Sequence, residues 1–460
     1  MALIKSISGI RGTIGGAAGH SLTPPDIVKY ASAFAQWVRK HSTSKKIVIG
    51  RDARISGKMV SNLVTSTLQS LGIEVIDLGL STTPTVEMAV PKEKAGGGII
   101  LTASHNPKQW NALKLLNEKG EFLSASDGDQ ILKIAELSEL SFAMIDDLGD
   151  YIKKREYIDY HINEILKLPL VDKELIQSKN FKVIVDGVNS TGGIAVPALL
   201  EKLGVSQIEK LFCEPTGEFP HNPEPLPENL TEISSKMRSG AFDLGIVVDP
   251  DVDRLAFLNE DGSLFGEEYT LVAVADYILK NKKGPAVSNL SSTRALRDVC
   301  TKHGVEYHAS AVGEVNVVEK MKAINAVIGG EGNGGIIYPD LHYGRDALVG
   351  IALFLTHLAQ SGKNMTELKA GYPPYHISKN KIELTPAIDV DDLLIKIKSV
   401  YKEEDINDID GVKIDFDHGW VHLRKSNTEP IIRIYSEAKD ESSANQLAEE
   451  MKGAIGRILG

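Results

Sequence analysis

The chain has 460 residues, which is too long for one hydrophobic core and predicts about three or four domains. Apolar residues make up 42% and charged residues 25% of the sequence, the balance of a globular protein rather than a disordered or fibrous one. The formal net charge of -11 argues against the basic surface that nucleic acids and anionic membranes require, so we expect neither partner.

Cysteine usage and hydropathy indicate the compartment. Only Cys213 and Cys300 occur, far apart and without the spacing of a metal site, which favours a reducing environment. The first residues lack the long apolar core of a secretory leader, and no 18-residue apolar run is found in the sequence. We therefore predict a cytoplasmic protein.

The first 100 residues alternate apolar strands with amphipathic helices. This alternation predicts a parallel sheet whose ligands bind at the carboxyl ends of the strands. Arg51, Arg54 and Ser104 all follow such strand ends. The expected elements are a helix at 24–40 capped by Thr23, strands at 46–50, 74–78 and 97–101, a helix ending near 70 and a short helix after Pro84.

Ser104 is presented on a turn after the third of these strands. The turn runs from Thr102 to Pro107, and Asn106 stands before the proline, so the helical region is disfavoured there. His105 and Asn106 place polar groups beside the serine hydroxyl. A serine at a strand end is more often a turn residue than a nucleophile, so its role depends on what the rest of the chain contains.

A second α/β unit is predicted after a polar helical stretch at 126–166. Strands are expected at 181–186, 208–213 and 243–249, with residues 255–258 continuing the last strand. Between these two segments Asp249, Asp251 and Asp253 recur at every second position, which in an extended segment places their carboxylates around one hard cation. An EF-hand is the rival interpretation, with Glu260 at its twelfth position, but Arg254 occupies the place of its glycine, so Mg²⁺ fits better than Ca²⁺.

A third α/β unit is expected from about residue 267, with strands at 286–290, 306–309 and 326–328. The loop from Gly330 to Gly335 matches the dinucleotide fingerprint literally, yet residues 336–339 cannot open a helix, so nucleotide binding is disfavoured. Glu331 and Asn333 on this glycine loop suit hydrogen bonding to vicinal hydroxyls of a sugar instead.

The last part of the chain follows a predicted linker and hinge at 371–375. A helix at 389–401, strands within 411–424 and at 431–436, and a helix at 442–459 predict a small α+β domain. Its loop at 424–430, with Arg433 nearby, combines guanidinium and hydroxyl groups that suit a phosphate dianion. The sequence contains neither a P-loop nor a Gly-x-Ser-x-Gly elbow, which disfavours ATP-dependent transfer and serine hydrolysis.

Together these motifs resemble the α-D-phosphohexomutase family over essentially the whole chain. They occur in the family's order: Gly-Ile-Arg-Gly, Gly-Arg-Asp-x-Arg, Thr-Ala-Ser-His-Asn-Pro, Asp-x-Asp-x-Asp-Arg, the Gly-Glu loop and Arg-x-Ser-Asn-Thr-Glu-Pro. The resemblance implies an α/β protein of four domains, three similar α/β units with mixed sheets and a smaller C-terminal α+β domain, around a central cleft. We expect these domains at 1–150 with the phosphoserine loop, 151–258 ending in the metal loop, 259–368 with the sugar loop and 369–460 with the phosphate loop.

The resemblance also implies a mechanism. A phosphoryl group on Ser104 is donated to a hexose phosphate, giving a 1,6-bisphosphate that turns around and returns its other phosphate; the bisphosphate serves as activator. Mg²⁺ would be held by Ser104, Asp249, Asp251 and Asp253, with Lys114, Arg11, Arg254 and His105 completing the catalytic set. Lys114 and Arg11 are alternative candidates for moving the hydroxyl proton. Substrate binding is expected of Glu331, Asn333, Arg424, Ser426, Asn427, Thr428 and Arg433.

The form of the sugar loop bears on the substrate. Asn333 and Gly335 stand where the family commonly has serine and histidine, and this form resembles the phosphoglucosamine mutase branch, which converts glucosamine 6-phosphate to glucosamine 1-phosphate. A phosphomannomutase or phosphoglucomutase of broad specificity is the alternative. A sugar-phosphate binding protein without turnover and a metal-dependent phosphatase are two further classes, and the intact serine, aspartates and arginine disfavour the first. We expect a sugar phosphate as the partner and a monomer or homodimer.

Overall fold

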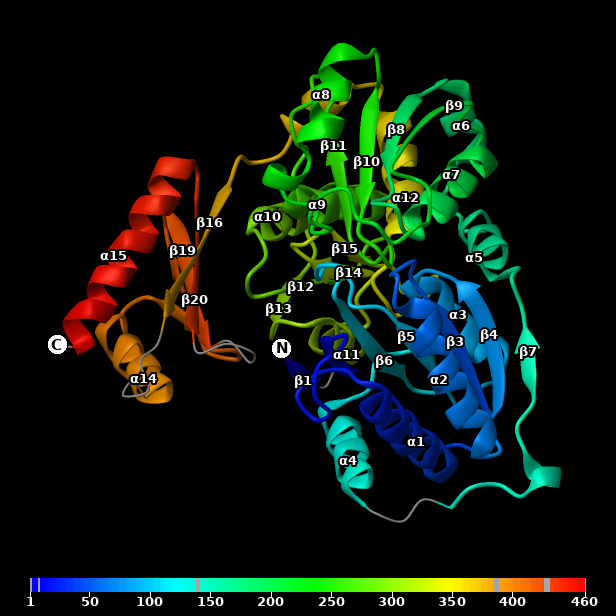
Figure 1. The fold of residues 1–460 in the computed structure, drawn as a ribbon. Coiled ribbons are helices and arrows are strands. Elements are labelled where there is room, and N and C mark those ends of the chain that lie inside the picture. The colour runs from blue at the N-terminus through cyan, green and yellow to red at the C-terminus, as the bar shows by residue number, and fades with distance from the viewer. Residues whose placement is uncertain (1, 7–8, 138–140, 384–388, 426–430, 460) are drawn as a thin grey trace. The chain divides into compact units, whose positions relative to one another are not determined.

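The structure is a computed structural model that describes residues 2–6, 9–137, 141–383, 389–425 and 431–459 (Figure 1). By their contacts these residues form two compact units. Unit 1 contains residues 1–270 and 334–366, and unit 2 contains residues 271–333 and 367–460. Among the described residues, no helix has the length and apolar character needed to cross a membrane.

The first sheet of unit 1 is mixed, because four parallel strands are flanked by antiparallel ones (Figure 1). The period-2 pattern of β3 explains how it is covered: Ile47 and Ile49 pack in the core with α1 and α2, while Val48 packs with α3. In sheet order the strands are β1 (Leu3–Ser6), β2 (Gly9–Thr13), β6 (Trp110–Leu116), β5 (Gly97–Leu101), β3 (Lys46–Arg51), β4 (Glu74–Leu80) and β7 (Tyr151–Lys153). The helices are α1 (Pro24–His41), α2 (Gly57–Ser70), α3 (Thr83–Lys92) and α4 (Ala125–Glu136).

The single helical stretch predicted at 126–166 is wrong. Instead α4 ends at Glu136, a 3₁₀ turn spans Ile145–Asp147, and the edge strand β7 precedes helix α5 (Tyr157–Ile165). The backbone at Gly149 lies close to Ile73, since a Cβ at this position would lie 1.9 Å from the carbonyl oxygen of Ile73. The segment is held extended against the first sheet.

A four-stranded sheet completes the α/β part of unit 1, and it carries the acidic loop. Strand β11 does not continue β10 as expected: it turns back and pairs antiparallel, with Val248 opposite Leu255, so the acidic residues lie at the tip of a hairpin. In sheet order the strands are β11 (Leu255–Leu258), β10 (Leu244–Val248), β8 (Lys182–Asp186) and β9 (Gln207–Leu211). The helices are α6 (Lys173–Ser178), α7 (Gly192–Lys202), α8 (Thr231–Ser239) and, after β15 (Gly335–Ile337), α12 (Ala347–Ser361).

Unit 2 begins with a parallel sheet in which β12 lies between β13 and β14. The fingerprint-like glycine loop leaves β14 and is followed by strand β15 instead of a helix, as predicted. The elements are β12 (Ala286–Asn289), β13 (Tyr307–Ser310), β14 (Ile328–Glu331), α10 (Ala295–His303) and α11 (Glu314–Ile324), and α9 (Glu267–Asn281) and α13 (Met365–Lys369) flank them in the chain.

The C-terminal sheet of unit 2 is antiparallel, and its two edge strands, β16 and β17, were not predicted. Strand β16 was missed because its sequence, His-Ile-Ser-Lys-Asn-Lys-Ile-Glu, is polar and half exposed, the pattern of an edge strand. In sheet order the strands are β16 (His376–Glu383), β20 (Ile431–Ala438), β19 (Gly419–Lys425), β18 (Val412–Phe416) and β17 (Asp405–Asn407), with helices α14 (Val390–Val400) and α15 (Glu441–Leu459). Blocks of strands and helices make this part α+β, and the four-domain α/β fold is confirmed.

An aromatic cluster fixes α12 to the hairpin that carries the acidic loop. Phe354 of α12 stacks on Phe257 of β11 with ring centroids 4.0 Å apart, and its edge meets Phe265 at 5.2 Å. All three rings are fully buried. The contact therefore packs α12 against β11, on the face opposite to Ala256 and Leu258, which pack with α8.

Replacing Phe354 tests this cluster. Phe354→Ala removes a fully buried ring and leaves a cavity, so we expect unfolding of unit 1 to be easier by about 3–5 kcal/mol. Urea unfolding followed by circular dichroism measures the shift. Phe142→Ala is the matched control, because Phe142 is 52% exposed and its loss should change stability by less than about 0.5 kcal/mol. Equal midpoints for the two variants would contradict this account.

Candidate functional site

The loop that presents Ser104 follows β5 directly. Ser104 has a φ of 47°, a left-handed conformation that is uncommon for a residue other than glycine. Its amide donates to Thr102 Oγ1 at 2.9 Å, and its hydroxyl donates to Asp249 Oδ2 at 2.6 Å. The hydroxyl also lies 3.4 Å from His105 Nδ1. The strained turn thus aims one hydroxyl at the acidic loop.

A single buried guanidinium holds this loop in place. Arg54 donates to the carbonyl oxygens of Ser104 and Asn106 through Nη2, and to those of Pro107 and Trp110 through Nη1 at 2.8 and 3.0 Å. Its Nε pairs with Asp52 Oδ2 at 2.9 Å, and the same carboxylate oxygen accepts from Thr102 Oγ1 at 2.7 Å. Asp52 and Arg54 therefore clamp the serine loop from the end of β3.

The three aspartates converge at the tip of the β10–β11 hairpin. Asp249, Asp251 and Asp253 are fully buried, and one oxygen from each lies within 4.8 Å of the others. Asp249 Oδ1 accepts from the amide of Asp253 at 3.1 Å, which closes the loop, and Val252 takes a φ of 63° to allow this turn. The predicted grouping of the three carboxylates is therefore found in the structure.

The donor set fits a hard cation. Asp251 Oδ1 and Asp253 Oδ1 are buried oxygens that have no hydrogen-bond partner among the residues that the structure describes. Their other oxygens accept from Lys114 Nζ at 2.7 and 3.5 Å, and Asp251 Oδ2 also accepts from Thr83 Oγ1 at 2.6 Å. Two orphaned carboxylate oxygens beside a serine hydroxyl are what an oxygen-preferring metal ion requires.

Burial and neighbouring charges shift the pKa values of two carboxylates of the triad in opposite directions. Burial, and then the charges of Asp251 and Asp253, raise the pKa of Asp249 well above its ordinary value. Asp253 behaves oppositely: burial would raise its pKa, but Arg345 and Lys114 outweigh burial and lower it. The guanidinium of Arg345 donates to Asp253 Oδ2 at 2.6 Å.

Lys114 is held as a cation. Burial alone would lower the pKa of Lys114, but Asp251 and Asp253 outweigh it and raise that pKa above its ordinary value. Lys114 enters the site from β6, a strand that pairs with β5 and so lies beside the serine loop. While the carboxylates are free of metal, its ammonium neutralises them.

The other predicted catalytic residues of unit 1 surround the serine loop. Arg11 Nη1 donates to Asn106 Oδ1 at 3.0 Å, and Arg254 Nη1 donates to Glu224 Oε1 at 3.2 Å. Burial, and then the charge of Arg254, lower the pKa of Arg11. The same two causes hold the pKa of His105 well below its ordinary value, so this imidazole is neutral at pH 7.

The predicted sugar and phosphate residues belong to unit 2. Glu331 ends β14, and its Oε1 accepts from Asn289 Nδ2 at 2.7 Å and from the amide of Gly313 at 3.1 Å. Asn333 follows it on the glycine loop. Arg424 and Arg433 are opposite each other on β19 and β20, so their side chains share one face. Ser426, Asn427 and Thr428 lie outside the described residues.

Three residues that position the site were not singled out from the sequence for these roles. Arg54 belongs to a quoted motif, and only its place at a strand end was noted. Thr83 lies in a run of threonines, and from the sequence alone these are more simply interpreted as helix-capping residues. Arg345 lies almost 100 residues from Asp253, and no spacing rule links them. The Gly-Arg-Asp-x-Arg motif is the one signal that could have found the first.

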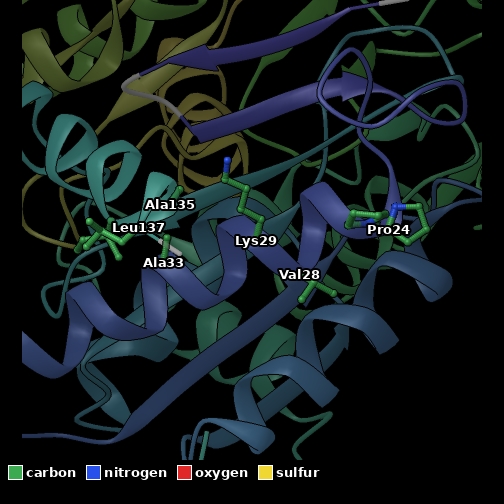
Figure 2. Close-up of a pocket in the computed structure, with 8 residues that line it drawn as sticks. Pro24, Val28, Lys29, Ala33, Ala135 and Leu137 are labelled. Carbon is green, nitrogen blue, oxygen red and sulfur yellow. The ribbon is translucent and has the colours of Figure 1, made fainter. Parts of the chain in front are cut away.

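An apolar hollow elsewhere in unit 1 has no part in this chemistry. It has a volume of about 550 Å³ and lies between α1 and the end of α4 (Figure 2). Figure 2 shows Val28, Lys29 and Ala33 of α1 facing Ala135 and Leu137. None of the residues that line it carries a carboxylate, hydroxyl or imidazole: Pro24, Pro25, Val28, Lys29, Ala33, Ile134, Ala135 and Leu137.

Comparison with known proteins accounts for nearly the whole chain. Four domain families match in order: phosphoglucomutase/phosphomannomutase alpha/beta/alpha domain I at residues 3–141, domain II at 155–262, domain III at 266–375 and the C-terminal domain at 386–454.

Relatives and solved structures match over similar lengths. A phosphoglucomutase/phosphomannomutase of Thermococcus kodakarensis is 34% identical over 95% of this chain and 96% of its own. A phosphoglucosamine/phosphogalactosamine mutase of Sulfurisphaera tokodaii is 32% identical over 99% of both chains. Among solved structures, a phosphoglucomutase/phosphomannomutase family protein from Burkholderia thailandensis has a TM-score of 0.83 at 23% identity, covering 98% of this chain and 96% of its own.

The fold extends to a more distant enzyme as well. An N-acetylphosphoglucosamine mutase of Aspergillus fumigatus, solved with GlcNAc-6P and magnesium, has a TM-score of 0.57 at 14% identity, covering 94% of this chain and 97% of its own. This likeness concerns the fold alone. With relatives above 30% identity over their full lengths, the chain belongs to the phosphoglucomutase/phosphomannomutase family, the α-D-phosphohexomutases, and it is an isomerase.

Proposed function

We propose that this phosphohexomutase interconverts hexose 6-phosphates and hexose 1-phosphates through a phosphoryl group carried on Ser104. The observation that supports this most is the 2.6 Å hydrogen bond from the Ser104 hydroxyl to Asp249, one of three buried carboxylates. A serine with an ordinary structural role gains nothing from so costly a neighbourhood. A serine that carries a phosphoryl group does gain from this position, if the carboxylates beside it hold a cation.

The reaction would proceed in two balanced transfers. In the first, the P–O bond to Ser104 Oγ breaks and the free hydroxyl of the hexose phosphate forms a bond to that phosphorus, losing its proton to a base. Ser104 Oγ takes up a proton as it leaves. The resulting 1,6-bisphosphate turns around. In the second transfer the P–O bond between its other phosphate and the sugar breaks, Ser104 Oγ loses its proton and bonds to that phosphorus, and the sugar oxygen takes up a proton. Free 1,6-bisphosphate would therefore act as an activator, because it phosphorylates a resting serine.

The proton carrier is Lys114 or Arg11. Lys114 is held as a cation by Asp251 and Asp253, so it can give up a proton only when those carboxylates are neutralised otherwise. Arg11 has a pKa lowered by burial and by Arg254, yet a guanidinium keeps its proton in proteins. Charge stabilisation of the phosphoryl group is the role that both cations can share.

The triad is proposed to hold Mg²⁺. Asp249, Asp251 and Asp253 would provide the carboxylate ligands, and the oxygen on Ser104 would complete the protein's share. When bound, Mg²⁺ neutralises charge on the phosphoryl oxygens and orients them for in-line transfer. The two orphaned oxygens of Asp251 and Asp253 support this assignment.

Substrate choice is proposed from the sugar loop and from the relatives. Glu331 and Asn333 would bind sugar hydroxyls, while Arg424, Arg433 and the loop with Ser426, Asn427 and Thr428 would bind the phosphate that is not transferred. The Sulfurisphaera relative, named for glucosamine and galactosamine phosphates, favours glucosamine 6-phosphate as the substrate. The Thermococcus relative favours the alternative, a phosphomannomutase or phosphoglucomutase of broad specificity. The cytoplasmic location, the choice between monomer and homodimer, and the domain boundaries stay predictions.

Turnover by Ser104→Ala tests the mechanism. Without the phosphoryl carrier, we expect the rate with Mg²⁺ and a trace of the matching 1,6-bisphosphate to fall by about 10³-fold or more. Glucosamine, glucose and mannose 6-phosphates are compared in a coupled assay, with glucosamine 6-phosphate expected to give the highest kcat/KM. Ser178→Ala, on the exposed side of α6, is the control for a serine without this role.

Three outcomes would change the proposal. Undiminished turnover by Ser104→Ala would exclude the phosphoserine pathway. Higher kcat/KM for mannose or glucose phosphates would assign the chain to the alternative substrate class, and net release of phosphate without isomerisation would indicate a phosphatase.

The pH dependence of stability tests the triad separately. Because the pKa of Asp249 is raised on folding, its protonated form stabilises the metal-free protein at low pH, and this contribution is lost as pH rises from about 4 through the folded pKa. Asp249→Asn removes the repulsion, so we expect Tm in EDTA at pH 8 to rise by about 2–4 °C. Mg²⁺ should raise Tm of the native chain and not of the variant. Parallel Tm curves against pH for the two proteins would disprove the coupling.

A further inference from the structure

A second buried cluster of metal-binding side chains lies in unit 1, apart from the serine and its carboxylates. His161 comes from α5, while His342 and Asp346 come from the segment that leads into α12. One ligand atom of each lies within 4.8 Å of the others. His161 and Asp346 are fully buried, and the side chain of His342 is 13% exposed. Neither the sequence motifs nor the proposed reaction uses these residues.

Both imidazoles direct the same nitrogen at one carboxylate oxygen. His161 Nε2 lies 2.8 Å and His342 Nε2 lies 3.3 Å from Asp346 Oδ2. The other oxygen, Asp346 Oδ1, is occupied, because it caps α12 by accepting from the amide of Leu348 at 2.8 Å. Both Nε2 nitrogens therefore lie close to Asp346 Oδ2, which is the carboxylate oxygen that does not cap α12.

The opposite nitrogen of each ring faces helix α3, and that of His161 is hydrogen-bonded to it. His161 Nδ1 lies 2.9 Å from Thr85 Oγ1, and His342 Nδ1 lies 3.4 Å from Glu87 Oε2. Metal-binding histidines are oriented in this way, with the far ring nitrogen on a carboxylate, carbonyl or hydroxyl. Gly344 closes the cluster, since a Cβ there would lie 1.9 Å from Glu87 Oε2 and 2.9 Å from the ring of His342.

The charges of the cluster balance with a dication. Glu87 and Asp346 are carboxylates with at most 2% exposure, and two imidazoles face them. A dication with neutral imidazoles supplies the same positive charge as two imidazolium rings.

We propose that His161 Nε2, His342 Nε2 and Asp346 Oδ2 form a second metal site for a divalent transition-metal ion of the Zn²⁺ class. Two imidazoles and one carboxylate are ligands that suit zinc and its neighbours and not Mg²⁺. The site would join α3, α5 and the start of α12. It is independent of the proposed mutase reaction.

Metal titration of the chelator-stripped full chain tests the site. Co²⁺ is the probe, because its visible absorption reports nitrogen and oxygen coordination at low coordination number, and Zn²⁺ content is counted by elemental analysis. We expect one equivalent of Zn²⁺ to be retained by Asp251→Asn, in which the acidic triad is disabled, and to be lost in His342→Gln. His308→Gln makes the same change at a half-buried histidine outside the cluster and should retain the metal.

A variant with a smaller structural change is the control for loss of metal through unfolding. Thr85→Val removes only the hydroxyl that orients His161 and keeps all three ligands, so affinity for Zn²⁺ should fall by about 10–100-fold. Circular dichroism checks that each variant is folded. If His342→Gln binds Co²⁺ with an unchanged spectrum, or if Asp251→Asn alone abolishes binding, the metal occupies only the acidic triad and the proposal is wrong.

Discussion

The geometry of the site depends on one buried guanidinium. Arg54 is 1% exposed, and its donors reach four carbonyl oxygens of the loop around Ser104 as well as the carboxylate of Asp52. No other side chain has a rigid fork of five donors, so lysine could satisfy only part of this set. The ring of Phe219 covers the guanidinium at 5.1 Å. Arg54 thereby ties the carbonyl oxygens of this loop to one side chain and holds the turn in which Ser104 is left-handed.

The acidic triad imposes a second constraint, because three carboxylates cannot be buried together without cations. Lys114 comes from β6 and Arg345 from the segment before α12, 231 residues apart in the sequence. Folding alone brings both to Asp251 and Asp253. The stability of the hairpin tip therefore depends on parts of the chain that a local view would treat as separate domains.

Much of the site could be predicted because its residues lie in short motifs. The turn at Ser104 and the alternating aspartates were located from spacing, since both follow apolar strands. Long-range partners could not be found in this way: Arg345 and Thr83 meet the triad through tertiary packing, which leaves no local pattern. Two strands of the fold, β6 and β16, were also not predicted, because neither shows a strong apolar run bounded by turns. We predicted that β11 continues β10, because two strands joined by a tight hairpin show the same pattern of apolar residues as one continuous strand.

Val252 shows how the parts of unit 1 must assemble. A β-branched residue with a φ of 63° costs about 1–2 kcal/mol more than an ordinary conformation, so the hairpin tip does not close on its own. The amide of Ala347 donates to the carbonyl oxygen of Val252 at 3.2 Å, and Arg345 binds the next residue, Asp253. During synthesis these partners leave the ribosome about 95 residues after the aspartates. A nascent chain that already contains all three carboxylates and Lys114 thus lacks two of the contacts that hold the hairpin tip, those from Arg345 and Ala347, until the start of α12 has emerged.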